Sequence, residues 1–272
     1  MQLHDQRIAR AGFGIASASE ADCDVHLRDW HLHRVPDAGM HGALATGSFS
    51  TSIRSRQFQI DLTLAATQPL LLQGSAGLSR KGPMADQASY YYSVPQLTVQ
   101  GSIALNGRQH VIDTDPAPGA NRAWMDHEWS EALMHADAVG WDWIGMNLLD
   151  GSALTAFRLR RADGSTLWAG GSMRMPGTAE ARIFAHDEVA FTPTRHWQSP
   201  HSRARYPVEW QVHTPAGAFR VRALLDDQEL DSNGSTGTVY WEGLSELQST
   251  SGQVLGRGYL EMTGYVRGIR LS

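Results

Sequence analysis

The sequence is poor in several features that would point to common classes of protein. Its single cysteine, Cys23, excludes an internal disulfide bond and any cysteine-rich metal site. No apolar run approaches the roughly 20 residues that a membrane-spanning helix needs. The net charge is −5, and the 23 basic and 28 acidic residues are well mixed. Because no basic block or stripe occurs, we expect no nucleic-acid partner.

Signals for export and for helices are also scarce. The first residues, MQLHDQRI, lack the basic and apolar regions of a secretory signal peptide, so the chain shows no targeting signal. Helical periodicity is almost absent, and only residues 130–138 could form a short helix or a turn.

The dominant period of the sequence is two, which is typical of half-buried β-strands. Residues 57–64 (QFQIDLTL) alternate clearly, and residues 254–270 suggest a run of short strands separated by glycine. Three hairpins are predicted, from residues 97–105 and 109–113 around Asn106-Gly107, from 154–161 and 166–173 around Asp163-Gly164, and from 211–213 and 219–225 around Pro215-Ala216-Gly217. With 27 glycines and 11 prolines, the pattern predicts an antiparallel all-β barrel or sandwich.

The best candidate for a linker is residues 113–121 (DTDPAPGAN), which hold two prolines and a glycine among polar residues. We therefore predict two domains, residues 1–120 and residues 121–272, each of a usual domain size.

Two acidic clusters rich in tryptophan are the most informative local feature. They are residues 124–129 (WMDHEW) and residues 140–143 (GWDW). An unpaired carboxylate is costly to bury, so these residues are expected to line a cavity that holds something apolar. Strand alternation places His127 and Trp129 on one face of the first segment, and Asp126 on the other with Glu128. In the second segment Asp142 shares an apolar face, opposite Trp141 and Trp143.

Several segments in the same order together resemble one family. They are residues 77–82 (GLSRKG), 89–95 (SYYYSVP), 124–129, 140–143, 197–200 (WQSP), 206–210 (YPVEW), 240–243 (YWEG) and 258–265 (GYLEMTGY). The chain resembles the lipocalin-like family of AttH proteins and carotenoid 1,2-hydratases, whose bacterial members are often labelled secreted hydrolases. The resemblance covers the chain from about Val25 onward.

The resemblance implies two consecutive lipocalin-like antiparallel β-barrel domains, an apolar isoprenoid or lipid-like ligand, and no cofactor. The family pattern normally begins with a Glu-Trp-Trp-Tyr region and an export signal, and neither is in this sequence. We therefore expect Met1 to start part-way through the first barrel, which would leave that barrel N-terminally incomplete and prone to self-association.

The family's hydratases use a His-x-Trp pair and an aspartate, and His127-Glu-Trp129 matches that pair. The candidate catalytic residues are Asp142, His127 and Asp126, with the two aspartates competing for the role of acid. A desolvated carboxyl group could stay protonated and give its proton to an alkene. Asp142 could equally accept structural hydrogen bonds, and His127 could be a satisfied core histidine.

Candidate ligand contacts come from the aromatic motifs. Trp rings stabilise cations but also dominate cores, so each could be a cavity wall or core residue. For Glu261 and Tyr259 the alternative is a strand with one polar face. The ligand-binding candidates are Trp129, Trp141, Trp143, Tyr92, Trp241, Tyr259 and Glu261.

Two functions remain open from the sequence. One is a cofactor-independent hydratase, a hydro-lyase that adds water to a C=C bond of an apolar isoprenoid. The other is a non-catalytic lipocalin that carries lipophilic molecules in the cell envelope beside an ABC export system. The family resemblance implies a periplasmic or cell-envelope location. His31 and His33 share a strand face, but no third ligand lies nearby in the sequence, so we expect no metal site.

Overall fold

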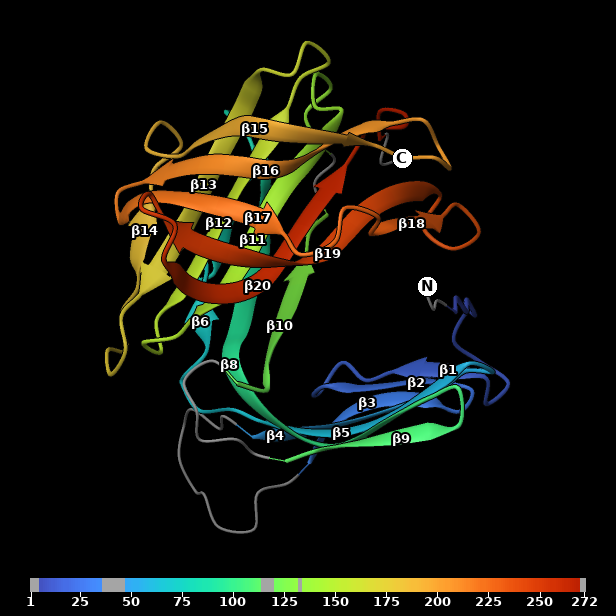
Figure 1. Cartoon of the computed structure of the whole chain (residues 1–272). Coiled ribbons are helices and arrows are strands. Elements are labelled where there is room, and N and C mark those ends of the chain that lie inside the picture. Colours follow the sequence, from blue (N-terminus) through green and yellow to red (C-terminus); the bar gives the residue numbers. More distant parts are fainter. Residues whose placement is uncertain (1–4, 36–46, 114–119, 132–133, 270–272) are drawn as a thin grey trace. The chain divides into compact units, whose positions relative to one another are not determined.

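A computed structural model describes residues 5–35, 47–113, 120–131 and 134–269 (Figure 1). Every regular element within these ranges is a β-strand, and none is a helix. The strands pair in antiparallel fashion with their neighbours, so the predicted antiparallel all-β class is confirmed.

The strands are numbered in the order in which they follow one another along the chain (Figure 1). The first ten are β1 (Ala16–Ala18), β2 (Asp24–Leu27), β3 (Trp30–Val35), β4 (Ser48–Arg54), β5 (Phe58–Ala65), β6 (Leu71–Leu72), β7 (Leu78–Arg80), β8 (Ala88–Leu105), β9 (Arg108–Ile112) and β10 (Arg122–Trp129). The others are β11 (Gly140–Leu148), β12 (Ala153–Arg160), β13 (Thr166–Arg174), β14 (Arg182–Phe184), β15 (Ala190–Gln198), β16 (Arg205–Thr214), β17 (Gly217–Ala223), β18 (Glu229–Ser232), β19 (Thr238–Ser249) and β20 (Val254–Thr263).

The chain forms two compact units. The first unit comprises Met1–Leu70 and Val94–Ala123, and the second comprises Leu71–Ser93 and Trp124–Ser272. Strands β8 and β10 contribute residues to both. The boundary between two folding domains at residues 120 and 121 stays a prediction. In the structure, residues 71–93 belong to the same compact unit as the later part of the chain.

The first unit is an antiparallel meander in which β1 to β5 pair in sequence and β5 pairs with β8. Strand β9 folds back onto β8. The side chains of Phe49, Leu97 and Val99 are buried in this unit. Because many of its other strand residues remain partly exposed, the first unit has a thin core.

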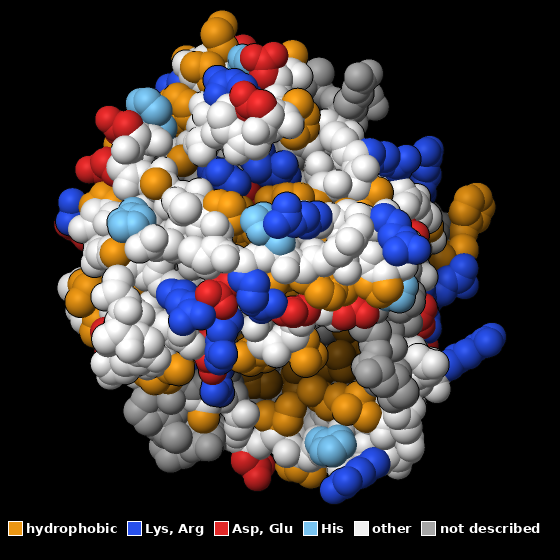
Figure 2. All heavy atoms as spheres, turned by 45° about the horizontal axis from the view of Figure 1, so that its top comes forward, with side chains coloured by type: hydrophobic (Ala, Val, Ile, Leu, Met, Phe, Trp, Pro, Cys, Tyr) orange, Lys and Arg blue, Asp and Glu red, His pale blue; other side chains and the backbone are white. Residues whose placement is uncertain are grey.

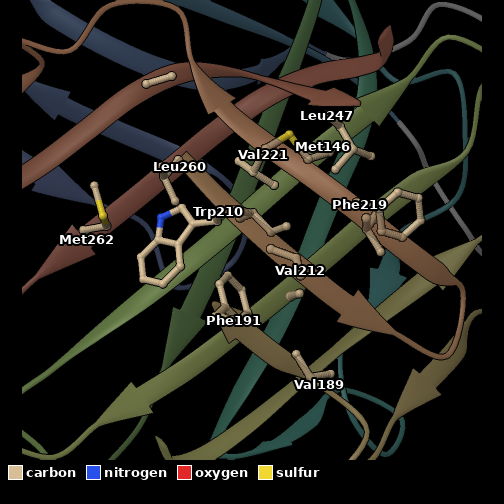
Figure 3. Packing of buried hydrophobic residues seen from close by; sticks show 14 of the residues in the cluster. Met146, Val189, Phe191, Trp210, Val212, Phe219, Val221, Leu247, Leu260 and Met262 are labelled. Carbon is tan, nitrogen blue, oxygen red and sulfur yellow. The ribbon is translucent and has the colours of Figure 1, made fainter. Parts of the chain in front are cut away.

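The second unit contains a long curled sheet in the order β14-β13-β12-β11-β20-β19-β17-β16-β15, with β18 paired to β19. Strands from both ends of this order contribute to one apolar core, as Phe184 of β14 and Phe191 of β15 show. Trp210, Leu260 and Met262 lie in the same core (Figure 3). Burying a large apolar side chain contributes about 1.5–3 kcal/mol, so this cluster dominates the stability of the unit.

The turn residues that predicted the hairpins form the expected turns. Asn106 and Gly107 join β8 to β9 with positive φ angles of 48° and 79°. Two positive φ angles in a two-residue loop define the twisted hairpin turn that Asn-Gly favours. The hairpins β12–β13 and β16–β17 also form, so all three predicted hairpins are confirmed.

Three local expectations meet different outcomes. Residues 130–138 form no helix where they are described, and Ala138 closes a turn by bonding back to the carbonyl of His135. The prediction of several short strands in residues 254–270 is wrong, because β20 runs unbroken from Val254 to Thr263. Most of the predicted linker, residues 114–119, lies outside the described residues.

Glycines inside β20 mark a close approach of backbones rather than strand ends. A Cβ atom added at Gly258 would lie 2.0 Å from the carbonyl oxygen of Gly145 on β11, and one at Gly256 would lie 2.5 Å from that of Asn147. Neither glycine has the positive φ that would favour glycine for its backbone alone. These positions therefore need the absence of a side chain so that β11 and β20 can pair.

Charges of both signs are interspersed on the surface, as one face shows (Figure 2). The pairs Arg195–Asp226 and Arg220–Glu209 lie at 2.7 Å and 2.6 Å. Arg195 and Asp226 are both partly exposed, and an exposed pair of this kind contributes little stability. Glu209 is largely buried, so its pairing with Arg220 compensates a desolvated carboxylate.

We expect Gly258→Ala to lower the free energy of unfolding by about 1–3 kcal/mol, the usual cost of overpacking. The added methyl group would force β11 and β20 apart. Urea denaturation measures the change. Gly234→Ala is the matched control, because a Cβ atom there meets nothing within 4 Å. Equal stability of the two variants would contradict the close-approach argument.

Candidate functional site

The second unit contains a cavity of about 390 Å³ whose wall is largely apolar and aromatic. Its lining comes from β8, β10, β11, β12 and β20 and from the connections between β7 and β8 and between β10 and β11. The lining residues are Lys81, Gln87, Ala88, Ser89, Tyr91, Asp126, Glu128, Ser130, Met134, Trp141, Trp143, Phe157, Leu159 and Glu261. Its volume falls in the range of about 300–1,000 Å³ that is usual for small-molecule sites.

Strand register brings one wall of the cavity together. Trp141 lies opposite Leu159, and Trp143 lies opposite Phe157 on one side and Glu261 on the other. Residues directly opposite in antiparallel strands point to the same face. The alternating positions of β11, β12 and β20 therefore build a continuous wall.

Glycines beside this wall make room for its rings. A Cβ atom at Gly145 would lie 2.4 Å from the Trp143 ring, and one at Gly170 would lie 3.0 Å from the Phe157 ring. The two indole N–H groups are also used, because Trp143 donates to the hydroxyl of Tyr91 at 3.1 Å and Trp141 donates to Glu261 at 2.6 Å. The rings are thus fixed by both packing and hydrogen bonds.

Two carboxyl groups in the cavity resist ionisation. Burial raises the pKa of Asp126 to about 6, although Ser93 donates a hydrogen bond to its carboxylate. Burial, together with the negative charge of Glu242, raises the pKa of Glu261 to about 7. Glu242 lies directly opposite Glu261 in the pairing of β19 and β20. Near neutral pH the cavity therefore holds a carboxyl group that is still partly protonated beside one that is mostly ionised.

A third carboxyl group, Glu128, is paired. Its carboxylate lies 2.8 Å from the Lys81 ammonium and accepts a hydrogen bond from Ser89 at 2.5 Å. The ammonium also lies 4.8 Å from the ring centroid of Tyr91 and 4.4 Å from that of Phe157. The Lys81 ammonium is therefore surrounded by a carboxylate and two aromatic rings of the cavity wall.

Asp142 lies on the opposite face of β11 and does not line the cavity. Its side chain is fully buried, and its carboxylate lies 2.7 Å from Arg158 and 3.3 Å from Arg160. Tyr265 donates a further hydrogen bond to it at 2.8 Å. These ion pairs and the hydrogen bond join β11, β12 and Tyr265 in the core. The arrangement favours the structural reading of Asp142.

His127 and Trp129 lie on the other face of β10 from Asp126. They form an aromatic cluster with Tyr90 and Tyr92, in which the imidazole Nδ1 of His127 lies 3.1 Å from the Tyr92 hydroxyl. Trp129 stacks on Tyr90 with ring centroids 5.5 Å apart. Trp129 is 50% exposed, and none of the four lines the cavity. Of the predicted site residues, this cluster gathers His127, Trp129 and Tyr92.

The remaining predicted contacts separate. Trp241 is fully buried in the core, and its indole donates to the carbonyl of Asp226 at 2.7 Å. Tyr259 is partly exposed and is not among the lining residues. The structure thus brings together Asp126, Trp141, Trp143 and Glu261 in the cavity, and places Trp241 and Tyr259 elsewhere.

Sequence reasoning missed several residues of the cavity. Tyr91 lies on the same face of its strand as Ser89 and Ser93, and Glu128 lies on the same face as Asp126. Strand alternation therefore predicts where both side chains point. Lys81 and Phe157 come from distant segments, and only the folded chain brings them to the same wall.

The two histidines of β3 lie close together without forming a metal site in the described part of the chain. His31 and His33 lie with ring centroids 5.0 Å apart. Among the residues that the structure describes, no group of three or more His, Cys, Asp or Glu side chains is placed to hold a metal ion. No helix in these ranges is long and apolar enough to cross a membrane.

Comparison with known proteins agrees with the class that the fold defines, a lipocalin-like all-β protein. A crystal structure of a candidate AttH protein from Nitrosomonas europaea matches with a TM-score of 0.85 and 44% identity, over 97% of this chain and 77% of that one. Kievitone hydratase from Nectria haematococca matches with a TM-score of 0.63 and 20% identity, over 79% of this chain and 64% of that one. The second likeness shows the fold alone.

The AttH-like family model matches residues 1–265. The chain therefore belongs to the AttH-like family, and the resemblance seen in its motifs is confirmed. The predicted fold of lipocalin-like β domains is confirmed by the same structures. No curated protein gives a significant match.

We expect Asp142→Asn to destabilise the fold by about 3–5 kcal/mol, because it removes the partner of two buried guanidinium groups. Thermal and urea unfolding measure the loss. Glu131→Gln, an exposed neutral substitution, is the control. A fully stable Asp142→Asn protein would contradict the structural role.

We expect Glu261→Gln to stabilise the protein at pH 8 and to have little effect at pH 4. A carboxyl group whose pKa is raised in the folded state contributes stability below its unfolded pKa, and that contribution is lost as the pH rises through about 7. At pH 8 the gain in the free energy of unfolding is at most roughly 3 kcal/mol. Contact of the carboxyl group with solvent makes the gain smaller. Denaturant titrations from pH 4 to 8 measure it, and parallel stability curves for both proteins would refute the expectation.

Proposed function

We propose that this protein binds an apolar, isoprenoid-like molecule in the cavity of the second unit and adds water to one of its C=C bonds. The observation that carries the proposal is a pair of carboxyl groups with raised pKa values, Asp126 and Glu261, that line an aromatic cavity. Their pKa values are raised to different extents, to about 6 and about 7. A pair of acids with separated pKa values is the usual mark of an acid and a base that work together.

Glu261 is suited to be the acid. When protonated, it can give its proton to one carbon of the alkene, which leaves a carbocation on the other carbon. Trp141 donates its indole N–H to this carboxyl group, so the charge that remains on Glu261 is stabilised as the proton leaves.

The wall of the cavity is suited to the cation. Trp141, Trp143, Tyr91 and Phe157 present aromatic rings, and a ring face stabilises a nearby cation by roughly 0.5–2 kcal/mol. Positive charge develops only in the transition state, so these contacts favour the reaction more than the binding of the neutral alkene.

Asp126 is suited to be the base. Its carboxylate can accept a proton from the water molecule whose oxygen attacks the cation. The product is an alcohol, with Glu261 ionised and Asp126 protonated, and exchange with solvent restores both groups. One water molecule is consumed, and no oxidant or reductant is needed.

The comparisons support this class of reaction. Kievitone hydratase bears a hydratase name and shares the fold. The family resemblance of the motifs supports an isoprenoid or lipid-like ligand, and a carotenoid hydration is the specific form that it suggests. A cavity of about 390 Å³ suits a small isoprenoid or the end of a longer chain.

We expect the hydration rate to peak near pH 6.5. The rate needs Asp126 ionised, which occurs above its pKa of about 6, and Glu261 protonated, which occurs below its pKa of about 7. It should therefore fall on both sides, as a bell. The assay offers a panel of acyclic terpenes and carotenoid ends in isotopically labelled water and follows label in the product by mass spectrometry.

Glu261→Gln and Asp126→Asn should each lower turnover by roughly 10²–10⁴-fold, the usual range for loss of an acid or base. Glu180→Gln, an exposed substitution, is the control. His127→Ala tests the other face of β10, because a loss as large as that of Glu261→Gln would move the site to the aromatic cluster. Tight calorimetric binding without label incorporation would place the protein among non-catalytic carriers.

A further inference from the structure

The strongly basic residues of this chain are almost all arginine, and lysine is rare. Of its 23 lysine and arginine residues, all but Lys81 are arginine. That single lysine lines the cavity. A guanidinium group stays charged in proteins, whereas an amine can lose its proton and become a nucleophile.

The surroundings of Lys81 fix it at this place. It follows β7, where the carbonyl of Arg80 accepts a hydrogen bond from the Trp168 indole at 3.0 Å. The backbone N–H of Lys81 bonds to the carbonyl of Gln87 at 2.7 Å and closes the connection to β8. The side chain is 22% exposed, so the amine lies at the cavity and does not extend into bulk solvent.

A purely electrostatic role would not require a lysine. Arginine makes two-point contacts with carboxylates and stacks on aromatic rings better than lysine. The chain uses it for that purpose elsewhere, since Arg158 lies over Trp210 and Arg160 over Tyr265 while both pair with Asp142. At position 81 the same combination of a carboxylate and two rings surrounds an amine instead.

We propose that Lys81 forms a reversible Schiff base with an apolar aldehyde bound in this cavity. The proposal rests on the proposed function in one respect, because both place an apolar ligand between the same aromatic walls. It adds a covalent step and a substrate class, aldehydes, that alkene hydration does not need.

The step is balanced and needs no other reactant. The ammonium gives a proton to Glu128, which lies 2.8 Å away, and the neutral nitrogen forms a bond to the carbonyl carbon. A proton moves from this nitrogen to the carbonyl oxygen, which becomes a hydroxyl group. Glu128 returns its proton to the hydroxyl, the C–O bond breaks, and water leaves. The product is a protonated imine, and hydrolysis reverses the sequence.

The site is built to hold that product. The imine nitrogen keeps the positive charge and one N–H, so Glu128 remains its counter-ion. The rings of Tyr91 and Phe157, now 4.8 Å and 4.4 Å from the ammonium, remain beside the charge. The hydrocarbon part of the aldehyde would lie along Trp143 and Leu159 of the cavity wall.

The test uses reductive trapping, which a chain with one lysine makes specific. The full chain is incubated with all-trans-retinal, an apolar isoprenoid aldehyde, and sodium cyanoborohydride reduces any imine to a stable amine. Intact mass and peptide mapping then separate Lys81 from the α-amino group, the other primary amine. We expect one saturable adduct on Lys81, and its loss when retinol, the matching alcohol, is present in excess. Glycolaldehyde, a polar aldehyde, should label Lys81 at least about tenfold less at the same concentration, because it gains nothing from the apolar wall.

Variants separate the covalent step from binding. Lys81→Arg and Lys81→Met should both lose the adduct, and calorimetry with retinol shows whether each still binds an apolar ligand. Retinol binding by the wild type without any adduct overturns the Schiff base and leaves the proposed hydration standing. Labelling of the α-amino group alone, or equal labelling by glycolaldehyde without competition by retinol, also overturns it. Failure of retinol binding together with failure of trapping counts against the cavity as a site for apolar ligands.

Discussion

Strand β11 has neighbours packed on both of its faces, and the carboxyl groups on the two faces differ in the partners that they find. On one face Asp142 lies in the core of the second unit, where an unpaired charge would be very costly, and two arginines and a tyrosine accompany it. On the other face Trp141 and Trp143 line the cavity with Asp126 and Glu261, whose carboxyl groups accept hydrogen bonds from neutral donors, Ser93 and the Trp141 indole. Desolvation raises the pKa of Asp126 and of Glu261, to about 6 and about 7. The same strand thus separates an ion-paired carboxylate of the core from the carboxyl groups that line the cavity.

The local parts of this arrangement were readable in the sequence. Turn residues predicted the hairpins, because Asn106-Gly107 and Asp163-Gly164 favour backbone angles that few other pairs adopt. Alternation placed Asp142 opposite Trp141 and Trp143 correctly. The division of β10 into a face with Asp126 and Glu128 and a face with His127 and Trp129 was also correct.

The partners of these groups could not be read in the same way. Asp142 is paired with Arg158 and Arg160, which belong to another strand, and the GWDW motif does not predict these partners. Glu261 resembled one residue of an ordinary polar strand face until register placed it beside Glu242 and Trp143. The glycines of β20 predict strand ends on the sequence alone, because glycine in a strand marks either a break or a close approach of another backbone. Long-range contacts decide each of these cases.

The hydrogen bond from the Trp141 indole to Glu261 has a consequence of its own. An indole that donates to a neutral carboxyl group experiences a different electric field from one that donates to a carboxylate. Its emission therefore changes when the proton arrives or leaves. The cavity carries an intrinsic optical indicator, in which an aromatic wall residue reports the charge of the neighbouring acid without any added probe.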